Sequence, residues 1–283
     1  MIIYLLVAFG AAALLLRQIF TVVQYFRSDL RSVPGPFIAR LTSGWYAWQV
    51  WQGSFQDVNR DLHQRYGSVV RYAPGRYSFS DLDAVKAIYG LGTSFPKSSW
   101  YTTWANPGSS SLFSKRALAK HAHDRKQYQA TYSMSSLMHY EPFVDDCADL
   151  FMTRLFQLST ASQAVDMRHW FQCYAFDVIG MITYGKRLGF LDKGEDIKDV
   201  IGALEDHLSY ATLVGIFPSL HQIMFPLKNF IAGGKGAGRA YIAAFTKERM
   251  SEERANPKAV DLSNSESMAQ NFLMKFLVSQ PEA

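Results

Sequence analysis

Residues 1–26, MIIYLLVAFGAAALLLRQIFTVVQYF, form an apolar run that carries a single charge, Arg17. An apolar helix of about 20 residues is long enough to cross the hydrocarbon core of a bilayer. Arg27 and Arg31 follow the run, and the positive-inside rule then places the rest of the chain in the cytosol. A cleavable signal peptide normally has a basic start, which this run lacks. The sequence predicts a transmembrane anchor at 1–26, with a buried soluble helix as the alternative.

A proline-rich hinge follows the anchor over residues 27–41 and contains Pro34, Gly35 and Pro36. Proline cannot continue a helix, and the residue before it favours an extended conformation. We expect the hinge to separate the anchor from a folded body at residues 42–283.

The body is expected to be mainly α-helical, with a small β-sheet near its start. Residues 68–80 alternate apolar and polar side chains around an APGR turn, which is typical of two strands. Apolar residues at three- and four-residue steps predict helices at 45–66, 81–90, 118–140, 141–159, 166–185, 195–212 and 235–254. A long loop at 91–118, a proline-broken connection at 215–232 and a last helix in SESMAQNFLMKFLVSQ complete the prediction.

Charge and cysteine content argue against two classes of protein. The 29 Lys+Arg and 24 Asp+Glu give a net charge of +5 without a basic run, so nucleic-acid binding is not expected. Cys147 and Cys173 have no zinc-site spacing, so they are interpreted as buried thiols and no metal site is predicted. The run AGGKGAGR lacks the full phosphate-loop pattern and is interpreted as a flexible loop. No motif of a catalytic nucleophile is present, so no catalytic residue is assigned.

Residues 120–133, KHAHDRKQYQATYS, hold the strongest candidate for a binding site. On a helix, His121 and His123 point about 200° apart and cannot hold one metal together. His121 and Arg125 are four residues apart and share one face. An imidazole beside a guanidinium suits a carboxylate or phosphate, since arginine binds planar anions through two hydrogen bonds. The alternative is a solvated charged helix face.

Five motifs then occur in a characteristic order: VPGPF, YGSVVRYAPGRYSFSDLDAVKAIYG, FPKSSWY, HAHDRKQYQATYSMSSLMHYEPFV and AFDVIGMITYGKRLGFL. This series resembles the N-terminal half of microsomal cytochrome P450 enzymes, most closely the fungal pisatin demethylase-like branch. The resemblance implies that His121 and Arg125 contact a haem propionate. It also implies substrate-lining residues in the segments 98–116 and 209–225, namely Trp100, Tyr101, Leu112, Phe113, Phe217 and Leu220.

For a complete member, the resemblance implies oxidation of a small apolar substrate in fungal secondary metabolism, with electrons from NADPH–cytochrome P450 reductase. It also implies an endoplasmic reticulum membrane protein that has a single span and a cytosolic body. The 283 residues contain no oxygen-binding helix, E-x-x-R pair or F-x-x-G-x-R-x-C-x-G haem-cysteine motif. We therefore expect an incomplete cytochrome P450 fold that is inactive by itself. The alternatives are a non-catalytic membrane-anchored helical remnant or interaction protein, and an unrelated membrane-anchored hydrolase.

Overall fold

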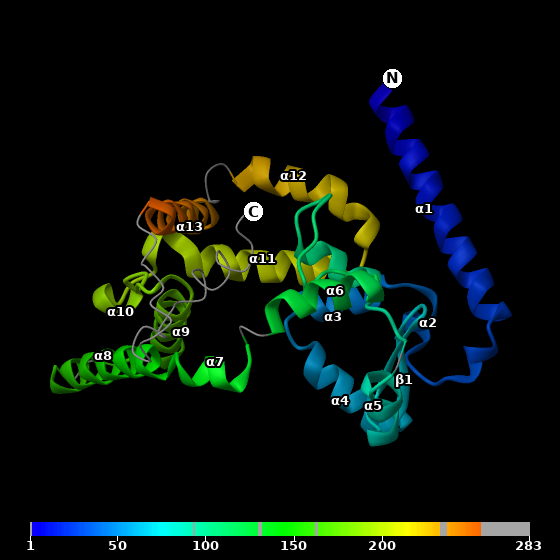
Figure 1. Ribbon diagram of the computed structural model, residues 1–283. Coiled ribbons are helices and arrows are strands. Elements are labelled where there is room, and N and C mark those ends of the chain that lie inside the picture. The colour runs from blue at the N-terminus through cyan, green and yellow to red at the C-terminus, as the bar shows by residue number, and fades with distance from the viewer. Residues whose placement is uncertain (1, 93, 130–131, 162–163, 233–236, 256–283) are drawn as a thin grey trace. The chain divides into compact units, whose positions relative to one another are not determined.

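The computed structural model describes residues 2–92, 94–129, 132–161, 164–232 and 237–255. The chain divides into two compact units (Figure 1). The first unit comprises Met1–Pro107 and Ala211–His221, and the second comprises Gly108–Tyr210 and Gln222–Ala283. The described residues are mainly helical and form a two-stranded sheet, which confirms the predicted secondary-structure class.

The first unit is built around a β-hairpin near the start of the body. Its elements are α1 (Ile2–Arg27), a 3-10 turn (Asp29–Ser32), α2 (Phe37–Leu41), α3 (Gly44–Trp51), α4 (Phe55–Tyr66), β1 (Val69–Ala73), β2 (Arg76–Phe79), α5 (Leu82–Tyr89) and two further 3-10 turns (Ser99–Trp104 and Pro218–Leu220). Strands β1 and β2 are antiparallel, with Val69 opposite Phe79. Gly75 in the connecting turn has a φ of 66°, a left-handed conformation that glycine adopts without strain. The predicted hairpin is confirmed.

Helix α1 contacts the rest of the first unit, where the Gln18 side-chain amide donates a hydrogen bond to the Leu41 carbonyl over 2.6 Å. Among the residues that the structure describes, none of the helices has the length and apolar character that crossing a membrane requires. The structure therefore does not show the transmembrane anchor predicted for residues 1–26.

The proline-rich hinge packs directly on strand β1. The Arg71 backbone N–H donates a hydrogen bond to the Pro34 carbonyl over 2.8 Å. Gly35 is buried, and a Cβ atom at this position would lie 2.1 Å from the Arg71 carbonyl oxygen. Only glycine allows the two backbones to approach so closely. The hinge is therefore part of the folded unit as well as a connection.

Two predicted elements differ from the structure. The helix expected at 45–66 is divided into α3 and α4, because the chain turns at Gly53, where φ is 76°. The connection expected at 215–232 is largely helical, since α12 (His221–Ala232) runs through Pro226. Proline removes a single helical donor, and the flanking apolar turns continue the helix on both sides of it.

The second unit contains the longest helices of the body. They are α6 (Leu118–Gln129), α7 (Met134–Met138), α8 (Glu141–Thr160), α9 (Met167–Tyr184), α10 (Phe190–Lys193), a 3-10 turn (Ile197–Asp199), α11 (Val200–Val214, which ends in the first unit), α12 beyond His221, and α13 (Ala237–Ala255). Helices α8, α9 and α13 match the predictions at 141–159, 166–185 and 235–254 closely. The prediction at 118–140 corresponds to α6 and α7. The last predicted helix lies outside the described residues.

The core of the second unit lies where α8, α9 and α10 meet (Figure 1). It contains Cys147, Phe151, Cys173, Leu188, Phe190, Leu191, Val200 and Ile201. Asp177 on α9 is completely buried beside this core. Its carboxylate accepts hydrogen bonds from the backbone N–H groups of Gly189, Phe190 and Leu191 over 2.8, 3.3 and 2.8 Å. The Asp177 side chain thus provides acceptors for the free backbone N–H groups at the start of α10 and connects α10 to α9.

Candidate functional site

Helix α6 carries the predicted anion-binding pair. The helix spans Leu118–Gln129, so His121 and Arg125 lie one turn apart on the same face. His121 is half-buried and Arg125 is exposed. The neighbouring carboxylate of Asp124 is ion-paired with Lys115. Because Lys115 already compensates Asp124, the guanidinium of Arg125 keeps its positive charge available to an external anion.

The two cysteines do not have the chemistry of an iron ligand. Burial first, and the nearby carboxylate of Asp177 second, raise the pKa of both thiols from 9.0 to about 11. Both are completely buried, and Cys173 Sγ lies 3.4 Å from Nε2 of His169. Because both sulfur atoms are enclosed by protein, neither is open to direct contact with a haem iron. Within the described residues, no cluster of three or more His, Cys, Asp or Glu side chains could hold a metal ion.

The described residues therefore match one part of haem and not another. The face of α6 with His121 and Arg125 suits the anionic propionates in charge and spacing. Neither cysteine suits the iron. The described residues fit the propionate end of haem and do not fit its iron.

The two segments predicted to contact substrate meet in the first unit. Trp100 Nε1 donates a hydrogen bond to the Thr212 carbonyl over 3.4 Å, and Thr103 Oγ1 donates one to the Ala211 carbonyl over 3.0 Å. A Cβ atom at Gly215 would lie 2.4 Å from Cδ1 of Trp100. The Arg76 side chain of β2 donates to the Ile216 carbonyl over 3.1 Å. These contacts fix residues 211–217 against both the 3-10 turn at Ser99–Trp104 and the hairpin.

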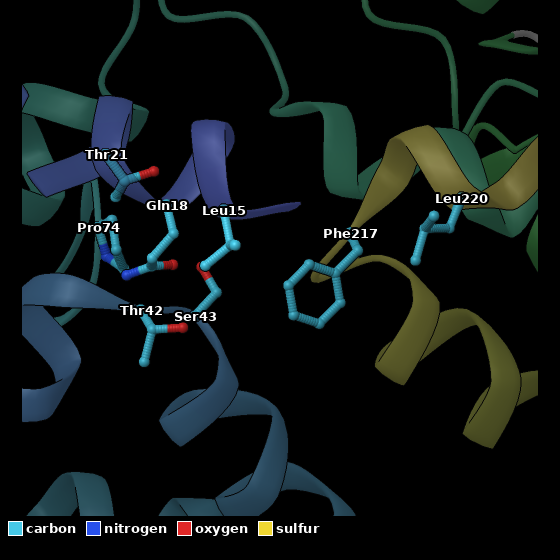
Figure 2. Close-up of a pocket in the computed structure, with 8 residues that line it drawn as sticks. All are labelled: Leu15, Gln18, Thr21, Thr42, Ser43, Pro74, Phe217 and Leu220. Atoms are coloured by element: carbon cyan, nitrogen blue, oxygen red, sulfur yellow. The ribbon is translucent and has the colours of Figure 1, made fainter. Parts of the chain in front are cut away.

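A pocket of about 660 Å³ lies beside residues 217–220 (Figure 2). Its lining residues are Leu15, Gln18, Thr21, Thr42, Ser43, Pro74, Phe217 and Leu220, and none of them carries a charge. Figure 2 shows Leu15 and Gln18 of α1 on one side and Phe217 and Leu220 on the other. The volume lies in the range of about 300–1,000 Å³ that is typical of small-molecule sites. Four of the eight lining residues, Gln18, Thr21, Thr42 and Ser43, carry hydroxyl or amide groups, and the other four are apolar.

The predicted site residues belong to two different units. Trp100, Tyr101, Phe217 and Leu220 belong to the first unit, and the last two line the pocket. Trp100 and Tyr101 instead pack edge to face, with ring centroids 5.2 Å apart. Leu112, Phe113, His121 and Arg125 belong to the second unit, and Phe113 is exposed. The roles of all eight residues remain predictions.

Sequence reasoning missed two buried charged residues that organise the structure, Asp177 and Arg71. Each is a single charge in an otherwise apolar stretch, AFDVIGM on α9 and VVRYA on β1. A charged residue on a buried face needs partners, because an uncompensated buried charge is strongly destabilising. This pattern is the signal that could have identified both.

Comparison with known proteins identifies the family. The model of the family described as "Cytochrome P450" matches residues 34–280. A pisatin demethylase of Fusarium vanettenii is 34% identical over 206 residues, which cover 73% of this chain and 40% of that protein. A cytochrome P450 monooxygenase of Aspergillus terreus is 30% identical over 276 residues, 92% of this chain and 54% of that protein. A benzoate 4-monooxygenase of Aspergillus niger is 32% identical over 67% of this chain and 38% of that protein.

The chain belongs to the cytochrome P450 family. The chain spans between 38% and 54% of the length of these three relatives. These relatives are fungal monooxygenases and a demethylase.

Proposed function

We propose that this chain forms the N-terminal part of a haem-thiolate monooxygenase that oxidises an apolar small molecule, with electrons from NADPH–cytochrome P450 reductase. Family membership and similarity to a fungal pisatin demethylase and a fungal cytochrome P450 monooxygenase support the reaction class. The observation that carries the substrate class is the uncharged pocket of about 660 Å³ beside Phe217 and Leu220. A bound charge would lack a counter-charge there, so an apolar molecule with a few hydroxyl or carbonyl groups fits best.

In this proposal, His121 and Arg125 hold the propionates of haem, which supplies the oxygen chemistry when it is bound. Apolar burial and axial ligation normally provide most of the affinity for such a group. Because both of its thiols are buried, the 283-residue chain by itself is proposed not to be a competent monooxygenase. The iron ligand is proposed to come from residues outside this sequence.

The proposed propionate contacts predict the effect of two substitutions on haemin affinity. Arg125→Ala and His121→Ala are each expected to raise the Kd for haemin about three- to fivefold, since an exposed charge-assisted contact contributes up to about 1 kcal/mol. The measurement is an absorbance titration of the full chain in a neutral detergent. Arg125→Lys should behave like the alanine variant, because lysine lacks the planar fork that binds a carboxylate with two hydrogen bonds.

Matched controls for this titration lie on the same helix. Lys126 and His123 are exposed on α6 but point away from the face of His121 and Arg125. Lys126→Ala and His123→Ala should leave the Kd within about twofold of the unmodified chain. Equal effects at all four positions, or the absence of saturable haemin binding by the unmodified chain, would contradict the proposed contact.

The alternative function is a non-catalytic helical remnant that acts only by contact with other molecules. Sequencing the transcript beyond the codon for Ala283 separates the two proposals. A reading frame that continues into an F-x-x-G-x-R-x-C-x-G motif supports the monooxygenase, whereas stop codons in all frames support the remnant.

We further propose that residues 1–26 attach the protein to the endoplasmic reticulum membrane, with the body in the cytosol. Support comes from exposed apolar side chains of α1 that line neither the pocket beside Phe217 nor a second pocket of the first unit, which include Leu16, Ile19 and Phe26. Basic residues follow at Arg27 and Arg31. In a flotation assay with microsomes, the chain should float and a variant without residues 1–26 should remain in the soluble fraction. Flotation of both would refute attachment through α1.

A further inference from the structure

Two arginines with unsatisfied hydrogen-bond donors line a second pocket of the first unit. This pocket has a volume of about 320 Å³. Its lining residues are Phe20, Thr21, Gln24, Tyr25, Ser28, Arg40, Arg71, Pro74, Gly75 and Tyr77. The Nε groups of both Arg40 and Arg71 are buried and have no hydrogen-bond partner. Buried donors are almost always paired in folded proteins, so two arginines of one pocket that each have an unpaired buried donor require an explanation.

Arg71 is the more constrained of the two. Its side chain is 2% exposed, and one of its amino groups donates a hydrogen bond to the Leu30 carbonyl. The guanidinium lies over two aromatic rings, 5.2 Å from the centroid of Tyr25 and 4.9 Å from that of Tyr77. The carbonyl and the rings compensate part of the charge, but they leave Nε unpaired. The rings also hold the planar group in a fixed orientation at the pocket wall.

Arg40 reaches the same pocket from α2. Its Nη1 donates a hydrogen bond to the Tyr25 hydroxyl over 3.3 Å, so one tyrosine contacts both guanidinium groups. No carboxylate is among the lining residues, and no ion pair joins either arginine to an acidic side chain in the described parts of the chain. Two partly buried like charges without a counter-charge repel each other and are desolvated at a cost. A bound anion would remove both penalties.

We propose that Arg40 and Arg71 form a binding site for a phosphate group in this pocket. A phosphate offers several acceptor oxygens, which can accept hydrogen bonds from guanidinium N–H groups of the two arginines that line the pocket. Arginine binds phosphate through paired N–H donors, and the rings of Tyr25 and Tyr77 orient one guanidinium in advance. The hydroxyl of Ser28 and the amide of Gln24, also on the lining, supply polar groups of the kind that complete such a site.

Calorimetric titration of the full 283-residue chain with inorganic phosphate tests this site. The titration is done in a neutral detergent, with ionic strength held constant by potassium chloride. Saturable binding is expected for the unmodified chain. Arg40→Gln and Arg71→Lys are each expected to raise the Kd for phosphate about tenfold. The first substitution removes a positive charge, and the second keeps the charge but loses the paired N–H donors of the guanidinium. Arg71→Lys also retains a cation at the buried position, which protects the test against simple misfolding.

The control is Arg65→Gln, since Arg65 is an exposed arginine on α4 in the same unit. It should leave the Kd for phosphate within about twofold. A parallel titration with dihexanoyl phosphatidic acid, against dihexanoylglycerol without phosphate, identifies the source of the group. Much tighter binding of the phosphatidic acid than of inorganic phosphate indicates a lipid headgroup, and similar affinities indicate free phosphate. Absent binding of both, or equal losses in Arg40→Gln and Arg65→Gln, overturns the proposal.

Discussion

Replacing Asp177 with alanine is expected to lower the free energy of unfolding of the second unit by roughly 3–5 kcal/mol. The carboxylate is fully buried and accepts three backbone hydrogen bonds from residues 189–191. A hydrogen bond to a charged group contributes about 1.5–3 kcal/mol, and the three donors would be left without an acceptor. Hydrogen–deuterium exchange should show loss of protection at the amides of Gly189, Phe190 and Leu191, together with a lower midpoint of guanidinium unfolding.

Two further variants make the Asp177 prediction specific. Asp177→Asn keeps the shape of the side chain but presents one acceptor oxygen in place of two. It should lower the free energy of unfolding by about 2 kcal/mol. Hydrogen exchange should then increase mainly at one end of residues 189–191. Asp145→Ala changes an exposed carboxylate on α8 and should alter stability by less than about 0.5 kcal/mol. If Asp177→Ala is no more destabilising than Asp145→Ala, Asp177 does not hold α10 against α9.

The second large effect is expected for Gly35→Ala in the proline-rich hinge. The added methyl group would lie 2.1 Å from the Arg71 carbonyl oxygen, which belongs to the backbone and cannot rotate away. The hinge would have to leave β1, which breaks the hydrogen bond between the Arg71 N–H and the Pro34 carbonyl. We expect a loss of about 2–4 kcal/mol in the first unit, from overpacking and one lost backbone hydrogen bond.

Tryptophan fluorescence during thermal unfolding measures this effect, because Trp45, Trp48 and Trp51 lie on α3 in the same unit. Gly44→Ala is the matched control, since its new Cβ would be 3.4 Å from the nearest heavy atom, Thr42 Oγ1, which is an ordinary contact. An unfolding midpoint in Gly35→Ala as high as in Gly44→Ala would show that the close approach to β1 is not required.

Elements with local signals were predictable from the sequence. Helix α9 has an unbroken apolar period between two clear boundaries. The Asp166 side chain accepts a hydrogen bond from the Arg168 N–H at the start, and Gly185 adopts a φ of 67° at the end. The β1–β2 hairpin was predictable for the same reason, because the APGR turn contains a glycine that tolerates positive φ.

Features that depend on residues distant in sequence were not predictable. The contact of Asp177 with residues 189–191 and the approach of Gly35 to Arg71 both join separate elements, and no local pattern specifies such pairs. The candidate site also combines a local feature that was predictable with a distant one that was not. Spacing alone put His121 and Arg125 on one face of α6, but only the structure showed that Phe217 and Leu220 line an uncharged pocket.

The most direct test of the proposed function is the absorption spectrum of the reduced, CO-bound chain after reconstitution with haemin. Thiolate ligation shifts the Soret band of such a complex to the red, which separates it from complexes with neutral ligands. We expect no thiolate-type band from these 283 residues, because Cys147 and Cys173 are completely buried in the core of the second unit and are not open to an iron atom. A thiolate-type band would show that one of them ligates the iron, and would contradict the proposal that the ligand comes from outside this sequence.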